Sequence, residues 1–365
     1  MIDSISIDNF RCFEHLKIKG FKSINLIGGQ NNSGKTALLE ALLLAFSPSI
    51  SSIDTLRQFR NENGNLIKNA NHRVWNHFFY NQNKSQKIKL IVDFDSQKAG
   101  NVELSCTNDM STIIEDMTVL GFKESMFELI SSKFSDIISL NIKVYDEPNK
   151  FYFSSYLFPD KENSNISAMG KGIKSSELPS FLHSSYRLDD NTLSSLYSLT
   201  KQNKKIKVLN DILNVLDNRI IGSEIDAPGG EPIIQLLLND EQSFPLAMFG
   251  DAIRKITELV LVLLNTPNKF ILIDEIENGI HFTKHRELWT KLFQIVGDDI
   301  QIFATSHSFE MIKAFNDVAY QTEFEDKAMY FQMARTERTH RLVTNPMNMD
   351  MLKYKIVNDR TFRGE

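Results

Sequence analysis

The segment from Ile24 to Phe46 reads INLIGGQNNSGKTALLEALLLAF, and it decides the fold of the chain. At its centre, Gly29 to Thr36 form a complete G-x-x-x-x-G-K-[ST] motif, in which glycines let backbone N–H groups turn inward around phosphate oxygens. The residues before it, Ile24 to Ile27, are apolar and predict a strand, whereas Ala37 to Phe46 are rich in strong helix formers. This order of strand, loop and helix predicts a nucleotide-binding α/β domain.

The loop residues have separate expected roles. Lys35 is expected to reach the β and γ phosphates of ATP, and the Thr36 hydroxyl is expected to hold Mg²⁺. The N-terminus of the following helix adds the positive end of its dipole. The residues predicted to surround the nucleotide are Gly29, Asn31, Asn32, Ser33, Gly34, Lys35 and Thr36.

The composition is that of a globular chain of 365 residues with a formal net charge of −5. This slightly acidic balance argues against a surface that is basic all over and coats nucleic acid unaided. The two cysteines, Cys12 and Cys106, lack C-x-x-C spacing, which disfavours a disulfide framework or a zinc site and favours a reducing cytoplasm. No apolar run approaches the roughly 20 residues that span a bilayer, so no membrane partner is expected.

The apolar pattern predicts an opening β meander, a second β region and a helical arm. The meander comprises Ile5–Phe10, Leu16–Ile18 and Ile24–Ile27. The second region comprises strands at Lys87–Phe94, Val102–Ser105, Thr112–Thr118, Ile138–Tyr145 and Phe151–Tyr156, with a helix at Glu124–Lys133. The polar stretch Asp160–Ser176 predicts a loop, and helical spacing of apolar residues predicts the arm at Ser194–Leu216.

A second apolar strand, Lys269 to Asp274, ends in the carboxylates Asp274 and Glu275. A strand that is apolar throughout is typical of the centre of a parallel sheet, where its carboxyl end lies beside the phosphate loop. We therefore expect Asp274 to bind Mg²⁺ through water. Glu275 is the expected general base, which polarises the attacking water.

A further apolar strand, Gln301 to Ala304, leads into Thr305-Ser306-His307-Ser308. A histidine at a strand end beside hydroxyl residues can hydrogen-bond the γ-phosphate or the catalytic water. We therefore predict that His307 is a catalytic residue.

Several motifs in order resemble those of ABC-type ATPases of the RecF, SMC and OLD group. They are the phosphate loop, a degenerate glycine signature within Phe244–Ala252, the Asp-Glu strand, Glu277–His281 and Thr305–Ser308. The opening Ile7–Phe13 and the Asn-Asn-Ser-Gly-Lys-Thr loop look most like the stand-alone OLD-like AAA ATPases of prokaryotic defence loci.

This resemblance implies an α/β fold: a P-loop NTPase head of ABC type with a mixed or parallel sheet core, an antiparallel β lobe and a helical insertion. It implies a single head over residues 1–365. Its expected regions are 1–46 with the first strands and loop helix, 47–160 with the β lobe, 161–230 with a helical arm or lid, and 231–365 with the signature, Asp-Glu strand and histidine.

The resemblance also implies a homodimer or higher oligomer in which two heads face each other across ATP. The signature residues that would touch the partner's γ-phosphate are Ala247, Met248, Phe249, Gly250 and Asp251. By the same analogy, Arg11 reaches the nucleotide, and Asn278–His281 lies at the dimer seam. A glutamine that senses Mg²⁺ is expected, and Gln82 and Gln86 both remain candidates.

Two positions depart from this group. Ala247 and Ala252 stand where such relatives place a serine and a second glycine, so a hydroxyl donor to the partner's γ-phosphate is missing. Losing one charge-assisted hydrogen bond costs about 1.5 to 3 kcal/mol, which is enough to slow turnover or make it partner-dependent.

Three functions remain open from the sequence. The first is an ATPase that gates a separate effector, a nuclease or Toprim-like protein, in anti-phage defence, because Ala328–Glu365 has no evident acidic metal cluster. The second is a RecF-like clamp that binds DNA in repair. The third is a scaffold that ATP stabilises with little turnover.

Overall fold

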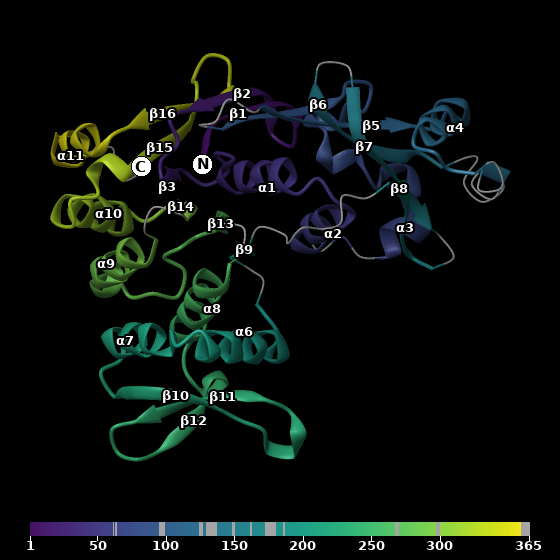
Figure 1. Ribbon diagram of the computed structural model, residues 1–365. Coiled ribbons are helices and arrows are strands. Elements are labelled where there is room, and N and C mark those ends of the chain that lie inside the picture. The colour runs from purple at the N-terminus through teal and green to yellow at the C-terminus, as the bar shows by residue number, and fades with distance from the viewer. Residues whose placement is uncertain are drawn as a thin grey trace. The chain divides into compact units, whose positions relative to one another are not determined.

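The computed structural model describes residues 1–60, 62, 64–94, 99–123, 127–128, 137–147, 150–160, 163–171, 180–184, 187–266, 270–296 and 300–358 (Figure 1). The chain divides into two compact units. Unit 1 comprises Met1–Phe21, Asn32–Leu178 and Met333–Thr344, and unit 2 comprises Lys22–Asn31, Pro179–Gln332 and Asn345–Glu365. In the described part of the chain, no helix is both long and apolar enough to cross a membrane.

Unit 1 contains an antiparallel sheet with the strand order β2-β1-β4-β5-β6-β7-β8. Its strands are β1 (Ile2–Phe10), β2 (Phe13–Lys19), β4 (Ile88–Phe94), β5 (Ala99–Thr107), β6 (Ser139–Glu147), β7 (Lys150–Asp160) and β8 (Asn165–Lys171). Inward residues such as Ile5, Ile7 and Leu90 are fully buried, because strands of alternating polarity bury one face. The predicted antiparallel β lobe is therefore confirmed.

The helices of unit 1 whose bounds lie within the described residues are α1 (Lys35–Phe46), α2 (Ile50–Phe59), α3 (Gly64–Ala70) and α4 (Met110–Val119), with short 3₁₀ turns η1 (Asn71–Arg73), η2 (Asn76–Phe78) and η3 (Tyr80–Gln82). Helix α1 follows the phosphate loop as predicted and is buried along nearly its whole length, from Lys35 to Leu44. A helix that is covered on all sides carries apolar residues on all of its faces.

The prediction of a strand at Thr112–Thr118 is wrong, because these residues lie in α4. Asp109 caps this helix by accepting a hydrogen bond from the Ser111 N–H, and its carboxylate also accepts one from the Thr112 hydroxyl. Ile113 and Met117, four residues apart, pack together against Tyr156 and Phe158. The helical spacing of these two apolar residues outweighs the β propensity of their neighbours.

The prediction of a loop at Asp160–Ser176 is also wrong in part, because β8 lies inside it. The Asp160 carboxylate accepts hydrogen bonds from Asn163 and Ser167, and so holds the turn that returns the chain along β7. Residues 161–162 and 172–179 lie outside the described part. The helix predicted at Glu124–Lys133 also lies outside it, apart from residues 127 and 128.

Unit 2 is built around the sheet with the strand order β16-β15-β3-β14-β13-β9. Its strands are β3 (Ile24–Gly29), β9 (Ser180–Leu182), β13 (Phe270–Ile273), β14 (Gln301–Ser306), β15 (Ala328–Arg335) and β16 (Leu342–Met347), of which the last two cross the boundary between the units. Strands β3, β14, β13 and β9 run parallel. The expected parallel core is confirmed.

One strand of the predicted meander leaves it. Strand β3 does not continue the sheet of β1 and β2 but lies between β14 and β15 in the other sheet. Its residues from Ile24 to Gly28 are buried without alternation, whereas β2 alternates between buried and exposed residues. A strand buried on both faces belongs inside a parallel sheet, which explains the departure.

The predicted arm forms two helices, α6 (Asp190–Gln202) and α7 (Ile206–Leu216). The other described helices of unit 2 are α8 (Asp251–Asn265), α9 (His285–Val296), α10 (Phe309–Gln321) and α11 (Met349–Asn358), with 3₁₀ turns η4 (Pro228–Gly230), η5 (Leu246–Met248), η6 (Phe282–Lys284) and η7 (Glu325–Lys327). A small antiparallel sheet, β10 (Ile220–Asp226), β11 (Ile233–Leu238) and β12 (Ser243–Pro245), lies beside α6 and α7 (Figure 1).

The core of unit 2 joins these helices to the parallel sheet. Helices α9 and α10 pack through aromatic rings, with the centroids of Trp289 and Phe315 4.9 Å apart and those of Phe293 and Phe315 5.8 Å apart. Trp289 also donates its indole N–H to the Met311 carbonyl oxygen, so its polar atom is satisfied inside the core. This packing holds the strand ends that carry the candidate site.

Candidate nucleotide-binding and catalytic site

Three neighbouring strands of unit 2 end at one edge of its sheet, where the start of the phosphate loop, Asp274–Glu275 and His307 follow them. Gly28 on β3 lies opposite Ser306 on β14, and Ala304 on β14 lies opposite Ile273 on β13. The start of the phosphate loop, the Asp-Glu pair and His307 therefore all follow strands that end at the same edge of one sheet. This edge of an open α/β sheet is where ligands bind in such folds.

Asp274 is buried, and hydroxyl groups hold both of its oxygens. The Thr305 hydroxyl donates to Oδ1 at 2.8 Å, and the Ser184 hydroxyl donates to Oδ2 at 3.1 Å. His183, which follows β9, lies 3.8 Å from Oδ2 through its Nε2. These contacts fix the direction of the carboxylate that the sequence assigned to Mg²⁺.

Glu275 adopts an uncommon backbone conformation, with a φ of 49°. Its N–H donates to the Thr305 hydroxyl at 2.8 Å, so Thr305 connects both members of the acidic pair. A non-glycine residue in the left-handed region carries strain that the surrounding structure must offset. Thr305 and the Lys255 ammonium, which donates to the Glu275 carbonyl oxygen, provide that support.

His307 lies directly after β14 and contacts Glu277. Its Nδ1 is 2.9 Å from Glu277 Oε1, and its backbone N–H donates to the same oxygen at 2.7 Å. The Ser308 N–H donates to this oxygen as well, and the Ser308 hydroxyl caps α10. The histidine side chain is 50% exposed, whereas that of Glu277 is 8% exposed.

Lys255 of α8 is buried close to these carboxylates. Burial, with a smaller contribution from Arg187, lowers the pKa of Lys255 to about 8, although Glu277, Glu275 and Asp274 act in the opposite direction. The buried ammonium thus balances part of the negative charge behind the acidic pair.

Two residues of the phosphate loop have a left-handed backbone conformation. Asn32 and Gly34 have φ values of 61° and 90°, and α1 begins at Lys35. A Cβ atom at Gly34 would lie 3.1 Å from Cys12, Phe13 and Leu342, so a side chain there meets both strain and crowding. The buried Ser33 hydroxyl has no hydrogen-bond partner among the residues that the structure describes.

Arg11 is engaged inside unit 1. Its Nε donates to the buried Glu40 carboxylate at 2.8 Å, and its guanidinium lies 4.6 Å from the centre of the Phe78 ring. Its Nη2 is buried and unbonded among the described residues. Gln82 accepts a hydrogen bond from Asn76 through its side chain, and Gln86 accepts one from Asn9 through its carbonyl oxygen. The expected roles of Arg11 and of either glutamine stay predictions.

The predicted signature segment is exposed at the start of α8. Met248 is 73% exposed, and Gly250 precedes the first residue of α8, Asp251. A Cβ atom at Gly250 would meet nothing within 4 Å, so packing inside this chain does not require glycine there. At Gly279, a Cβ atom would lie 3.3 Å from the Ala252 nitrogen, so this loop lies against the start of α8.

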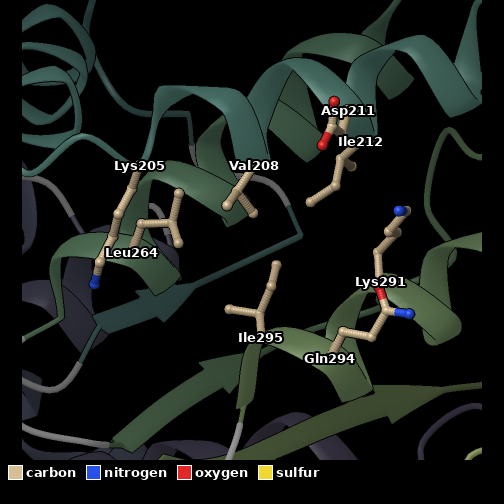
Figure 2. A pocket seen from close by; sticks show the side chains of 8 residues that line it. All are labelled: Lys205, Val208, Asp211, Ile212, Leu264, Lys291, Gln294 and Ile295. Atoms are coloured by element: carbon tan, nitrogen blue, oxygen red, sulfur yellow. The ribbon is translucent and has the colours of Figure 1, made fainter.

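Figure 2 shows a separate pocket of about 360 Å³ between α7 and the last turns of α8 and α9. The residues that line it are Lys205, Val208, Asp211, Ile212, Leu264, Lys291, Gln294 and Ile295. None of them belongs to the predicted site. This pocket is therefore distinct from the strand ends that carry the acidic pair.

Four residues of this arrangement escaped sequence reasoning. Thr305 and Glu277 lie inside motifs that the sequence analysis quoted, but their contacts depend on the pairing of β13 with β14. Ser184 and Lys255 lie in no motif, and only tertiary structure brings them to the acidic pair. Hydroxyl residues at the end of an apolar strand are the one sequence signal available, and of these four residues they indicate Thr305 alone.

Comparison with protein families gives a match to the model described as AAA domain, over residues 4–261. The chain belongs to the AAA domain family. It is accordingly an ATPase, as the phosphate loop and Asp-Glu strand predict.

Individual relatives are more distant. The chain is 24% identical over 382 aligned residues to an ATP/GTP phosphatase of Helicobacter pylori, and the match covers 100% of both chains. It is 32% identical over 95 residues to the DNA double-strand break repair Rad50 ATPase of Saccharolobus solfataricus, covering 26% of this chain and 10% of that protein. A solved SMC head domain from Thermotoga maritima is 10% identical, with a TM-score of 0.44 and coverage of 95% and 99%.

Proposed function

We propose that this chain binds and hydrolyses ATP, dimerises around it, and thereby gates a separate effector, a nuclease, in prokaryotic defence against phage. The observation that carries the proposal is the common edge at which β3, β13 and β14 end in the phosphate loop, Asp274–Glu275 and His307. Family membership and the name of the full-length relative, an ATP/GTP phosphatase, support the hydrolytic part.

Each unit supplies residues that suit one part of a magnesium-bound triphosphate. The unsatisfied Ser33 hydroxyl and the left-handed backbone at Gly34 suit phosphate oxygens, and the oriented Asp274 carboxylate suits a hard cation. Thr36 and Asp274 would hold Mg²⁺, which neutralises charge on the phosphates when it is bound.

Each side chain then has a task. The Lys35 ammonium pairs with the β and γ phosphates, and Glu275 accepts a proton from the attacking water. His307 hydrogen-bonds the γ-phosphate or that water. Thr305, through its bonds to the Glu275 N–H and to Asp274, keeps the base and the metal ligand in register.

A homodimer is supported by the surface of the signature. Met248 and Phe282, both large and apolar, are 73% and 60% exposed near the start of α8 and in the turn after His281. Because Gly250 has free space on this chain, its lack of a side chain suits the close approach of a partner's phosphates. The alanines at positions 247 and 252 predict weak closure that an effector strengthens.

The defence role and the effector are supported by the OLD-like order of motifs. A DNA-repair clamp is the second candidate, because a segment of the chain is 32% identical to a protein named as a repair ATPase. The net charge of −5 favours the first over the second. Gel shifts with duplex DNA at low salt separate them: ATP-dependent retention supports the clamp.

The decisive experiment measures ATP binding and phosphate release with Mg²⁺. We expect Lys35→Ala to lose ATP binding, and Glu275→Gln to bind ATP but hydrolyse it at least about a hundredfold more slowly. Matched exposed controls, Lys17→Ala and Glu241→Gln, should behave as the wild-type protein. Wild-type activity in both site variants would refute the assignment.

The effector is tested by co-expression with the products of neighbouring genes. We expect a nuclease or Toprim-like protein to co-purify with the chain and to change its activity when ATP is added. If no neighbouring product binds, and the wild-type chain expressed with its neighbouring genes protects cells against no phage, the gating role is wrong while the ATPase assignment stands.

A further inference from the structure

The Glu277 carboxylate concentrates its contacts on one oxygen. Oε1 accepts the backbone N–H groups of His307 and Ser308, at 2.7 and 3.2 Å, and lies 2.9 Å from His307 Nδ1. The other oxygen, Oε2, is buried and has no hydrogen-bond partner among the described residues. A buried carboxylate oxygen without a hydrogen-bond partner costs free energy, which the nearby charge of the buried Lys255 ammonium offsets in part.

The contact at Nδ1 determines where the imidazole carries its hydrogen. An ionised carboxylate can only accept hydrogen bonds, so a ring nitrogen 2.9 Å from it must be the donor. In the neutral ring, Nε2 is then the acceptor, and on protonation Nε2 becomes a donor. The partner of one ring nitrogen thus sets the chemistry of the other.

The buried Glu277 carboxylate holds the more exposed His307 ring in place. Glu277 is buried beneath a half-exposed imidazole, and its two backbone contacts fix its oxygen relative to the end of β14. Rotation of the His307 ring about its Cβ–Cγ bond would break the Nδ1 contact. The ring is therefore held with Nε2 directed away from Glu277.

We propose that Glu277 is a positioning residue, which holds the His307 imidazole in the Nδ1–H tautomer and leaves Nε2 to meet the γ-phosphate or the attacking water. This inference rests on the proposed ATPase site, since Glu277 acts through His307. It differs from the proposed function because it concerns a residue that never contacts ATP.

Two substitutions at position 277 separate the acceptor from the rest of the side chain. In Glu277→Gln, the amide oxygen can take the place of Oε1 and keep all three contacts. In Glu277→Ala, every contact is lost. We expect kcat to fall about tenfold to a hundredfold in Glu277→Ala, with the Kd for ATP within a few-fold of wild type, and Glu277→Gln to recover most of the loss.

Two controls distinguish positioning from a loss of structure. Ser308→Ala removes the cap of α10 but leaves the Glu277–His307 contact, so it should lower the thermal midpoint with little change in kcat. In a His307→Ala background, Glu277→Ala should cause no further loss of kcat. An equal loss in both backgrounds would overturn the inference, as would wild-type kcat in Glu277→Ala.

A third readout does not depend on turnover. The ¹⁵N shifts of the His307 ring, assigned by their absence from His307→Ala, should show the Nδ1–H tautomer in wild type and lose it in Glu277→Ala. A wild-type ring protonated on Nε2 alone contradicts the inference even if the protein hydrolyses ATP. If the protein proves inactive but the tautomer is Nδ1–H, the proposed function fails, while the positioning of the His307 ring by Glu277 stands.

Discussion

The acidic pair, Asp274 and Glu275, is held by neutral hydroxyl groups and by one buried ammonium group. Thr305 and Ser184 orient Asp274, and Lys255 donates to the Glu275 carbonyl oxygen. Hydroxyl groups orient a carboxylate without cancelling its charge, which leaves it able to bind a cation. The ammonium of Lys255 is almost fully withdrawn from water, and this burial disfavours its charged form.

The buried lysine predicts a specific dependence of stability on pH. Burial lowers the pKa of Lys255 to about 8 from its ordinary 10.5, so between these values the unfolded chain binds more protons there than the folded chain. The free energy of unfolding therefore rises with pH in this window. Relative to Lys255→Met, wild type should gain about 2 kcal/mol between pH 7.5 and 10 in urea denaturation.

The control for this prediction is an exposed lysine of unit 1. Lys17→Met on β2 should differ from wild type by the same free energy at both pH values. A wild-type advantage over Lys255→Met that does not change with pH would show that Lys255 keeps its ordinary pKa in the folded protein.

Among single residues, the sequence predicts the functional side chains that directly follow apolar strands. It does not predict side chains that contact them from a neighbouring strand. Asp274, Glu275 and His307 stand directly after apolar runs, so their shared edge could be expected. The hydrogen bond from the Ser184 hydroxyl to Asp274 joins positions 90 residues apart in the sequence. No local pattern contains such a contact, because it depends on the pairing of β9 with β13.

Secondary-structure elements are fixed around the phosphate loop by close strand packing. Gly28, near the end of β3, faces Tyr330 of β15, and a Cβ atom there would lie 2.1 Å from the tyrosine oxygen. Tyr330 is 1% exposed, so its ring cannot swing into solvent without opening the core. The missing side chain of Gly28 thus makes room for this aromatic ring beside the loop.

Overpacking at this contact gives the prediction for the elements. Gly28→Ala should destabilise the protein by about 1–3 kcal/mol, and the loss should shrink in a Tyr330→Leu background, where the ring is absent. Chemical denaturation of the four proteins of this cycle measures the coupling. Gly222→Ala on β10 is the matched control, because its Cβ finds only an ordinary contact at 3.4 Å, and it should cost little. Additive losses at 28 and 330 would contradict the packing argument.

The elements that the sequence predicts are those with strong local patterns. The alternating strands of the β lobe and the apolar strands β13 and β14 are predicted correctly, because alternating residues indicate burial on one face and continuous apolar residues indicate burial on two. Strand β3 is predicted at the right residues but in the wrong sheet. Helix α4 was mistaken for a strand, since its helical signal consists of one cap and one apolar pair. Strand β8 was missed because its residues, Asn165 to Lys171, are largely small or polar.

At the scale of the whole molecule, the proposed function requires a second copy. The surface at the start of α8 combines the exposed Met248 with a glycine at position 250 that its own chain leaves uncovered. In the proposed dimer, this surface would face the nucleotide that the partner holds.

The position of Gly250 allows assembly to be tested apart from folding. In the Glu275→Gln background with ATP and Mg²⁺, light scattering after gel filtration should give twice the mass of one chain, 41.9 kDa. Gly250→Asp should prevent this doubling by charge repulsion against the partner's triphosphate. Its thermal midpoint should hold or rise, because Asp is a favourable N-cap and its Cβ meets nothing within 4 Å.

The uncharged variant Gly250→Asn completes the comparison. It has the size and capping ability of Asp, so it should weaken dimerisation less than Gly250→Asp does. Full dimerisation of Gly250→Asp would mean that this segment does not face a phosphate in the assembly, and the sandwich arrangement would have to be abandoned.

The pairing of β3 with β14 has a consequence for how the protein is made. Ile24 lies beside Ile302, so the central strand of the sheet is translated long before its neighbour exists. At roughly 5–20 residues per second, the ribosome needs tens of seconds to deliver β14. During that interval the nascent chain carries the apolar β3 without its final partners. A chaperone that covers early segments would protect this strand from aggregation until β14 is made.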